Sequence, residues 1–478
     1  MSTRNMMEVI LQSPTSVSLF GVFVVLLVLQ LLYSSFGSPR SRELPGPRPV
    51  PLLGNLLQVD LKRLDQSLFH LSRTFGPIFQ VYFGPKKVVV LAGYRTVKEA
   101  LLNQADEFGN REITPLFYDF TQGHGILFSN GDSWKEMRHF ALTTLRKFGM
   151  GKKMSEEIII QECGYLIEEM KQYKGKAFNN TQAINYAVSN VVSALVFGKR
   201  FEYEDPVFQK MVERDNKIIH LIGSVSLQIY NFMPWLGPFF KNWKNVMKNV
   251  EDGKADAWKK IVDLKETLNP ELCRCFVDAF LIHKKHLEES GIRNSHYHDD
   301  NLVYSVATLF AAGTDTTSTT LKRSLLYMVK FPHIQDHVQE ELSRVVGRRQ
   351  LQNLEDRKDL PYTDAVLHET QRFANITPIV ISHTTSKDAT FQGYFIKMDE
   401  GEWGSTHSFN LSNSQDKEAK FIRRDAFMSD AAGHNVCLEE SLSRMELFLF
   451  FTSLSQHFCS TPPLGTKKVK LCHLDQFL

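Results

Sequence analysis

The sequence predicts a mostly α-helical domain of the α+β class, with a long buried helix at its centre and a small β-rich region near its N-terminus. Beyond Thr96 the apolar residues recur mainly at helical spacing. Residues 78–92 contain two runs rich in aromatic and β-branched side chains, a pattern typical of a strand hairpin. Residues 300–330 form one uninterrupted helical pattern, about 45 Å long at the usual rise per residue.

Composition sets the broad class of the protein. Of the 478 residues, 43% are hydrophobic and 23% are charged, which indicates a large packed core and excludes a disordered chain. Lys and Arg number 56 against 53 Asp and Glu, so the net charge of +3 is too balanced for a dedicated nucleic-acid binder. Six cysteines are too few for a disulfide framework, which favours a reducing compartment.

The first element, residues 1–36, is predicted to be an N-terminal transmembrane anchor helix. Residues 17–33 carry no charge and just reach the length that spans a bilayer core. A cleaved secretory signal and a buried core helix are the alternatives. Arg40, Arg42 and Arg48 follow the apolar run, and this bias favours a single-pass signal-anchor with the rest of the chain in the cytosol.

Residues 37–55 are predicted to be a proline-rich hinge, because four prolines between Leu44 and Asn55 restrict φ and stiffen the chain. Residues 56–478 are then one catalytic domain. Its first strands are expected at residues 78–83 and 87–92, on either side of Gly84-Pro85.

The helix at residues 300–330 ends before Phe331-Pro332. Its centre, residues 306–313, is apolar all round, so we expect it to be buried on every side. Gly313 and the polar residues 314–317 follow directly, and they destabilise a buried helix unless they have partners. A threonine hydroxyl that bonds a helix carbonyl can bend the helix and open a groove. A solvated polar patch is the alternative, but it fits the apolar flanks poorly.

At this point a family resemblance is carried by several motifs. Ala312-Gly-Thr-Asp-Thr-Thr317 resembles the central-helix motif of the cytochrome P450 superfamily of haem-thiolate monooxygenases. Trp134-Lys-Glu-Met-Arg138 is similar to its Trp-x-x-x-Arg element, and Glu369-Thr-Gln-Arg372 to its Glu-x-x-Arg helix. The hinge and residues 128–134 and 356–364 resemble the vertebrate microsomal family-two branch. The resemblance is continuous from the anchor to about Lys397 and broken beyond it.

The resemblance implies a cofactor, haem b, and residues that hold it. Cys437 is implied as the axial ligand of the haem iron, and it precedes a helical pattern whose N-terminus favours a thiolate. A buried structural cysteine is the alternative. Glu369 and Arg372 are implied as a structural pair, although on their own they would be an ordinary surface ion pair. The implied propionate partners are Trp134, Arg138, Arg111, His383 and, in part, His434.

The resemblance also implies the reaction: monooxygenation of an apolar small-molecule substrate, such as a fatty acid, steroid or xenobiotic. Electrons would come from NADPH through a separate reductase, possibly with cytochrome b5, at the endoplasmic reticulum membrane. Thr316 would serve proton delivery and Asp315 would help relay protons. The residues expected to line the substrate pocket are Phe310, Ala311, Ala312 and Val380.

The cysteine loop departs from the family pattern Phe-x-x-Gly-x-Arg-x-Cys-x-Gly. Gly433 and Cys437 are kept, but Asp430, Asn435 and Glu439 replace Phe, Arg and Gly. Roughly a dozen residues that would form a core strand after residue 397 are also expected to be missing, as is the usual C-terminal hairpin. The alternative function is therefore a non-catalytic, membrane-anchored homologue with impaired or absent haem binding.

Overall fold

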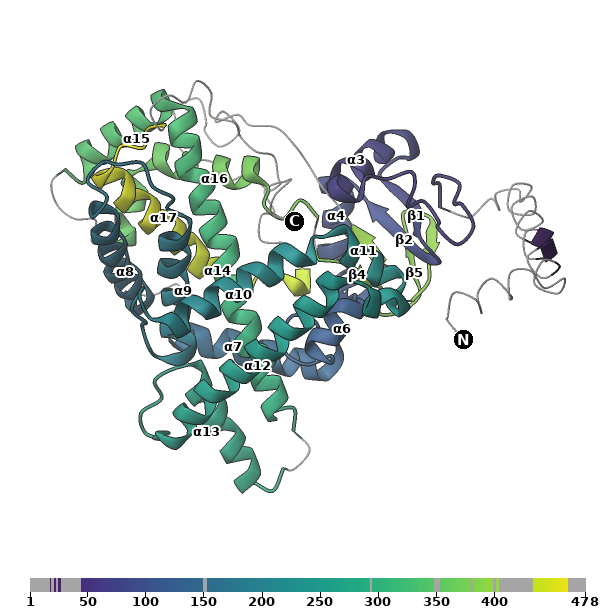
Figure 1. The fold of residues 1–478 in the computed structure, drawn as a ribbon, viewed down its shortest axis with the longest axis horizontal. Coiled ribbons are helices and arrows are strands. Elements are labelled where there is room, and N and C mark those ends of the chain that lie inside the picture. Colours follow the sequence, from purple (N-terminus) through teal and green to yellow (C-terminus); the bar gives the residue numbers. More distant parts are fainter. Residues whose placement is uncertain are drawn as a thin grey trace, which may run out of the picture.

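The structure is a computed structural model that describes residues 44–148, 153–292, 295–347, 353–379, 381–398, 401–403 and 433–462, with five further positions between 18 and 26. Figure 1 shows a large helical part and a smaller part that contains the strands. The mostly helical fold with small sheets is the one that the sequence predicts.

The helices of the described residues run from the β-rich part through the helical part and back to the centre of the molecule. Their bounds are α3 (Leu64–Phe75), α4 (Tyr94–Lys98), α5 (Ala105–Phe108), α6 (Pro115–Thr121), α7 (Gly131–Lys147), α8 (Lys153–Lys171), α9 (Thr181–Phe197), α10 (Pro206–Ile222), α11 (Val225–Phe232), α12 (Lys241–Glu266), α13 (Phe276–Glu289), α14 (Asp299–Lys330), α15 (Pro332–Val345), α16 (Pro361–Ala374) and α17 (Glu440–His457). Short 3-10 or π turns are η1 (Leu61–Arg63), η2 (Glu99–Asn103), η3 (Pro234–Phe239), η4 (Leu354–Asp359) and η6 (Gly433–Asn435).

The larger sheet has the strand order β1-β2-β7-β4-β3. Its strands are β1 (Ile78–Phe83), β2 (Lys86–Leu91), β3 (Asn110–Arg111), β4 (His383–Thr384) and β7 (Gly401–Trp403), and a second sheet pairs β5 (Ala389–Phe391) with β6 (Tyr394–Ile396). The expected hairpin of β1 and β2 is confirmed, with β2 beginning one residue earlier than predicted. The short β7 lies between β2, to which it is parallel, and β4, to which it is antiparallel.

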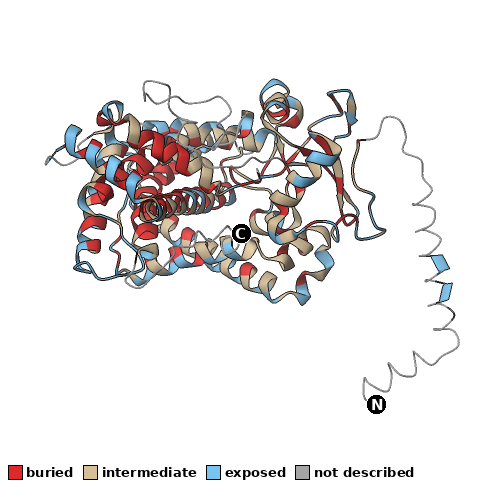
Figure 2. Cartoon of the chain, turned by 90° about the horizontal axis from the view of Figure 1, so that it is seen from above, coloured by how far each residue is buried: buried red, intermediate tan, exposed pale blue. Residues whose placement is uncertain are grey.

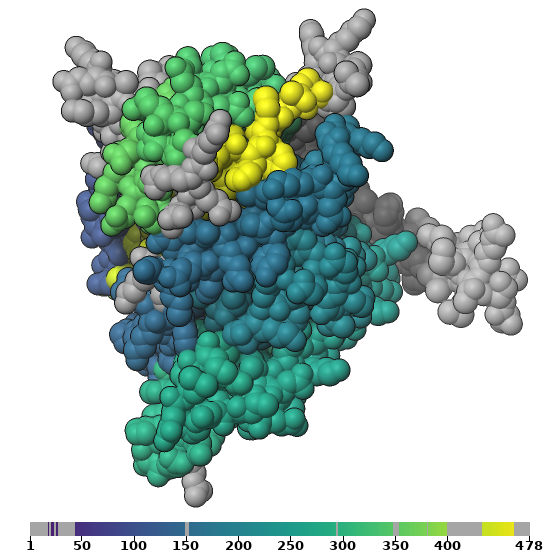
Figure 3. All heavy atoms as spheres, turned by 90° about the vertical axis from the view of Figure 1, so that its left-hand side faces the viewer, coloured from purple at the N-terminus to yellow at the C-terminus, as the bar shows by residue number. Residues whose placement is uncertain are grey.

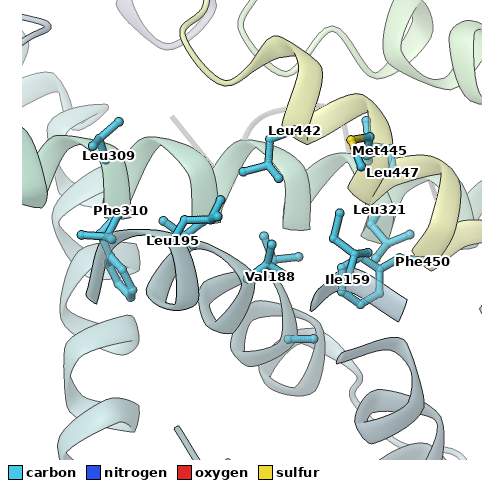
Figure 4. Close-up of a cluster of buried hydrophobic side chains, with 14 of the residues drawn as sticks. Ile159, Val188, Leu195, Leu309, Phe310, Leu321, Leu442, Met445, Leu447 and Phe450 are labelled. Carbon is cyan, nitrogen blue, oxygen red and sulfur yellow. The ribbon is translucent and has the colours of Figure 1, made fainter. Parts of the chain in front are cut away.

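The predicted central helix is confirmed as α14, which begins at Asp299 and ends at Lys330. Figure 4 shows its apolar side chains between those of α9 and α17; Leu309 and Leu321 of α14 lie near Leu195 of α9 and Leu442 of α17. All four are buried, and each such side chain contributes roughly 1.5–3 kcal/mol of transfer free energy. Figure 2 shows that the buried residues concentrate in these packed helices, and Figure 3 shows α17 emerging between the two halves of the helical part.

The expectation that the centre of α14 is buried on every side is wrong. Ala307 and Ala312 are exposed, and Thr308 and Ala311 are only partly buried. These positions share one side of the helix, which faces a cavity instead of another helix. The small apolar side chains of this segment therefore serve as a cavity wall as well as a core.

Residues 44–55 lie against the β-rich part. The backbone N–H of Gln80 donates to the Pro45 carbonyl at 2.8 Å, and that of Tyr82 donates to Asn55 Oδ1 at 2.7 Å. At Gly54, φ is +60° and a Cβ would lie 2.2 Å from the Tyr82 carbonyl oxygen, so the close approach requires glycine.

The predicted anchor helix, residues 1–36, lies almost entirely outside the described residues. Within the part of the chain that the structure describes, no helix combines the length and apolar character needed to cross a bilayer. The anchor is not confirmed.

Candidate functional site

The predicted cysteine loop leads into α17 through η6. Gly433 has a φ of +73°, and a Cβ there would lie 1.9 Å from the Leu101 carbonyl oxygen, so this position requires glycine. Cys437 is exposed and lies just before Glu440, the first residue of α17. The positive end of the helix dipole therefore faces the sulfur and favours a thiolate.

Arg111 of β3 reaches this loop from the sheet. Its Nη1 donates to the Ile381 carbonyl at 3.0 Å and lies 3.0 Å from His383 Nε2, and its Nη2 donates to the Asn435 carbonyl at 3.3 Å. His383 is held by the Phe108 carbonyl, 2.8 Å from its Nδ1. The antiparallel pairing of Arg111 with His383 places the two side chains next to each other.

Arg138 and Trp134 reach the same loop from α7. The guanidinium of Arg138 lies 5.7 Å from the centre of the Trp134 ring and donates to the Val436 carbonyl. The indole Nε1 of Trp134 is buried and has no hydrogen-bond partner among the described residues, and the same holds for Nε of Arg111. Two buried donors thus remain available for an acceptor that belongs to a ligand.

The electrostatics of this cluster favour an anion. Burial lowers the pKa of Arg111 to about 10, and the nearby charge of Arg138 lowers it further. Burial lowers the pKa of His383 to about 4, and Arg111 adds to that shift, so the imidazole is neutral at pH 7. The described residues provide no carboxylate within ion-pair distance of Arg111 or Arg138. The two unpaired guanidinium groups and the free indole donor fit the negatively charged propionates that the sequence predicts.

Two further predicted residues lie in the loop but point elsewhere. His434 is exposed, and its Nε2 lies 2.9 Å from Asp106 Oδ1, so the structure does not bring it to Arg111 and Arg138. Asn435 is buried, and its Nδ2 donates to the Gly109 carbonyl at 2.6 Å. The replacement of an arginine by Asn435 therefore contributes a bond that holds the loop against α5, while leaving one cation fewer in the site.

Glu369 and Arg372 form a bidentate pair on α16. Nε of Arg372 lies 2.6 Å from Oε2 of Glu369, and its Nη2 lies 2.8 Å from Oε1. Glu369 is fully buried, so this pair is much better ordered than an exposed ion pair at the same spacing.

Glu439 occupies the position where the sequence analysis expects a close backbone approach. Its side chain is buried, and a Cβ added to Gly313 of α14 would lie 2.7 Å from its Oε2. Burial raises the pKa of Glu439 to about 8. One face of α17 also carries Glu446, whose pKa burial raises well above its ordinary value, with repulsion from Glu439 adding to the shift. The absence of a side chain at Gly313 gives the Glu439 carboxyl its space.

A cavity of about 360 Å³ lies along the exposed side of α14. It is lined by the predicted Phe310, Ala311 and Ala312 and also by Asp315 and Thr316. The predicted Val380 lies outside the described residues.

The acid and alcohol of α14 therefore meet at one cavity wall. The Thr316 hydroxyl donates to the Ala312 carbonyl at 2.9 Å, which is the side-chain to backbone bond expected for a threonine in this helix. Burial raises the pKa of Asp315, and the charge of Lys322 partly opposes that shift.

The sequence analysis missed the charged residues of the opposite wall. Arg214 and Asp215 of α10 line the same cavity. Their signal in the sequence is a charged pair within the helical stripe that contains Met211, Ile218 and Ile222.

Comparisons with known proteins agree with this geometry. The sequence model of the family described as Cytochrome P450 matches residues 44–478. The chain is 58% identical to Cytochrome P450 2K1 of Oncorhynchus mykiss over 475 residues, which cover 96% of this chain and 94% of that protein. It is 49% identical to Cytochrome P450 2K6 of Danio rerio, over 88% of this chain and 85% of that protein. It is 38% identical to Cytochrome P450 2F3 of Capra hircus, over 94% of each chain.

Proposed function

Because this chain belongs to the cytochrome P450 family of haem monooxygenases, we propose that it inserts one oxygen atom from O₂ into an apolar small-molecule substrate, with NADPH-derived electrons supplied by a separate reductase. The observation that carries this proposal is the convergence of Arg111, Arg138 and Trp134 on the loop that precedes Cys437. Three elements far apart in the sequence thus place anion-binding groups and a thiol side by side.

Haem b fits the donors of this site. The guanidinium groups of Arg111 and Arg138 and the indole N–H of Trp134 would bind its propionates, and Cys437 would ligate its iron. When bound, haem supplies the chemistry of O₂ activation. The helix dipole of α17 and the charge of Arg138 would both keep the Cys437 sulfur anionic.

Thr316 and Asp315 are the groups that would manage protons in the cavity. The Thr316 hydroxyl accepts a proton-bearing water while it donates to the Ala312 carbonyl. Asp315 has its pKa raised by burial, so it can exchange a proton with such a water at neutral pH more readily than an exposed aspartate. Apolar side chains make up most of the cavity wall, and they keep bulk water away from the reacting atoms.

The apolar cavity supports a substrate that is itself largely apolar, a broad class that includes fatty acids, steroids and xenobiotics. We place the protein at the endoplasmic reticulum membrane, held by residues 1–36 with the catalytic domain in the cytosol. Its expected partners are the reductase, possibly cytochrome b5, and membrane lipid.

The difference spectrum of the ferrous, carbon-monoxide-bound protein tests the proposal. A Soret band typical of thiolate ligation in the purified full chain, lost in Cys437→Ser, supports it because a serine hydroxyl is a far weaker ligand to iron. Cys459→Ser is the matched control and should keep the band. No band after haem supplementation would instead support the alternative of a non-catalytic homologue, and a band that survives Cys437→Ser would assign the ligand to another residue.

A further inference from the structure

One face of α10 presents an unusual pattern to the cavity. Four of its lining residues are apolar: Met211, Ile218, Ile219 and Ile222. Between them, at successive positions of the same face, lie Arg214 and Asp215. A charged pair in the middle of an apolar cavity wall is costly unless it has partners, so the partners of each charge decide what the pair does.

Arg214 is held from the side of α12. Its exposed fraction is 6%, and its Nη1 lies 2.5 Å from Oδ2 of Asp256. A Cβ added to Gly253 would lie 3.1 Å from Nε of Arg214, so this glycine lets the guanidinium lie close against the helix. Arg214 thus has a counter-ion and a fixed position.

Asp215 has no counter-ion of its own. Its Oδ1 lies 3.9 Å from Nε of Arg214, and the structure gives its carboxyl no hydrogen bond among the described residues. At that distance the interaction with a guanidinium already bonded to Asp256 is weak. The three groups Arg214, Asp215 and Asp256 have charges of +1, −1 and −1, so this corner of the cavity has a formal excess of one negative charge.

The cation contributed by α12 to the cavity wall does not neutralise that charge. Nζ of Lys254 donates to the Tyr304 hydroxyl at 2.9 Å and lies 3.5 Å from Oδ1 of Asp300. The carboxyl of Asp215 is therefore the acceptor left over in the wall. Burial raises its pKa to about 7, with Arg214 opposing the shift, which is the behaviour of a carboxylate that lacks a cation.

We propose that Asp215 is a specificity-determining residue that binds the protonated amine of an otherwise apolar substrate. The inference deepens the proposed function, since it takes this cavity as the substrate cavity. A cationic amine would complete the charge balance at α10, and the rest of the molecule would lie along the apolar wall towards Ala312 and Thr316 of α14. A carboxylate ligand would face Asp215 and Asp256 at the same corner and would be repelled.

Three ligands of similar size and different charge test the inference. They are N,N-dimethyl-4-phenylbutylamine, 4-phenylbutanol and 4-phenylbutyrate, and their equilibrium binding to the purified full chain is measured by calorimetry at pH 7.5. The tertiary amine is chosen because its methyl groups hinder ligation to a metal. We expect the amine to bind about ten-fold more tightly than the alcohol, and the carboxylate to bind most weakly.

Asp215→Asn should lower the affinity for the amine to that for the alcohol, while alcohol binding, which reports an intact cavity, stays unchanged. Asp215→Glu should keep part of the preference. Asp252→Asn, on an exposed position of α12 outside the cavity, is the matched control and should keep all of it.

Tighter binding of the carboxylate, equal binding of the three ligands, or an amine preference that survives Asp215→Asn would each overturn the inference. These results are distinguishable from failure of the proposed function. A chain that gives no thiolate spectrum but keeps the Asp215-dependent preference refutes the monooxygenase and supports the amine site, and the reverse result refutes the amine site alone.

Discussion

Replacement of Glu439 by glutamine should remove a pH-dependent cost to folding. Glutamine has the same shape as glutamic acid and no charge. Glu439 is buried against Gly313, and burial raises its pKa from an ordinary 4.5 to about 8. An acid whose pKa is higher in the folded state destabilises that state as pH rises above its unfolded value, and the cost stops growing above the folded pKa.

The size of the effect follows from these two values. At pH 5 the unfolded carboxyl is only beginning to gain from ionisation, and the cost of keeping it protonated is about 1 kcal/mol. At pH 8 the cost is about 4 kcal/mol by the same relation. Between these pH values, Glu439→Gln should therefore gain about 3 kcal/mol of stability relative to the unmodified chain.

Urea unfolding followed by tryptophan fluorescence, at pH 5, 6, 7 and 8, measures this difference. Glu271→Gln is the control, because Glu271 is exposed in the loop before α13, and its difference should stay flat over the series. The amide also has to fit an apolar site, so an offset common to all pH values is expected. A difference for Glu439→Gln that does not grow with pH would refute the reasoning that burial controls this carboxyl.

The other predictions concern the site and the topology. Thr316→Ala should keep haem bound but raise the NADPH consumed per product formed, because the hydroxyl serves proton delivery; an unchanged ratio would remove Thr316 from that role. The double change Asn435→Arg with Glu439→Gly should raise the haem-to-protein ratio measured by absorbance, because it restores a cation beside Arg111 and removes a buried acid; an unchanged ratio would show that these substitutions do not impair binding. Endoglycosidase treatment of the protein made in microsomes should leave its mass unchanged, and a shift would contradict a cytosolic location for the acceptor sequences at Asn179, Asn375 and Asn410.

The sequence by itself determined the elements whose causes are local. The bounds of α14 were predicted within one residue at its start, because Pro332 and the helical spacing of apolar residues act over a few positions. The hairpin of β1 and β2 was predicted for the same reason, since its turn and strand residues are neighbours in the chain. Glu369 and Arg372 are one helical turn apart, so their pairing also follows from spacing.

Only the tertiary structure decided which side of each element faces which neighbour. Arg111 and His383 are 272 positions apart, and their contact depends on the pairing of β3 with β4. The Glu439 carboxyl could be predicted to be crowded, but the approach of α17 to α14 determined that Gly313 makes room for it. The centre of α14 has an apolar pattern all round, which does not reveal that one side borders a cavity. Periodicity gives the faces of a helix, whereas the packing of distant segments decides whether a face meets another helix, an ionised side chain or an open space.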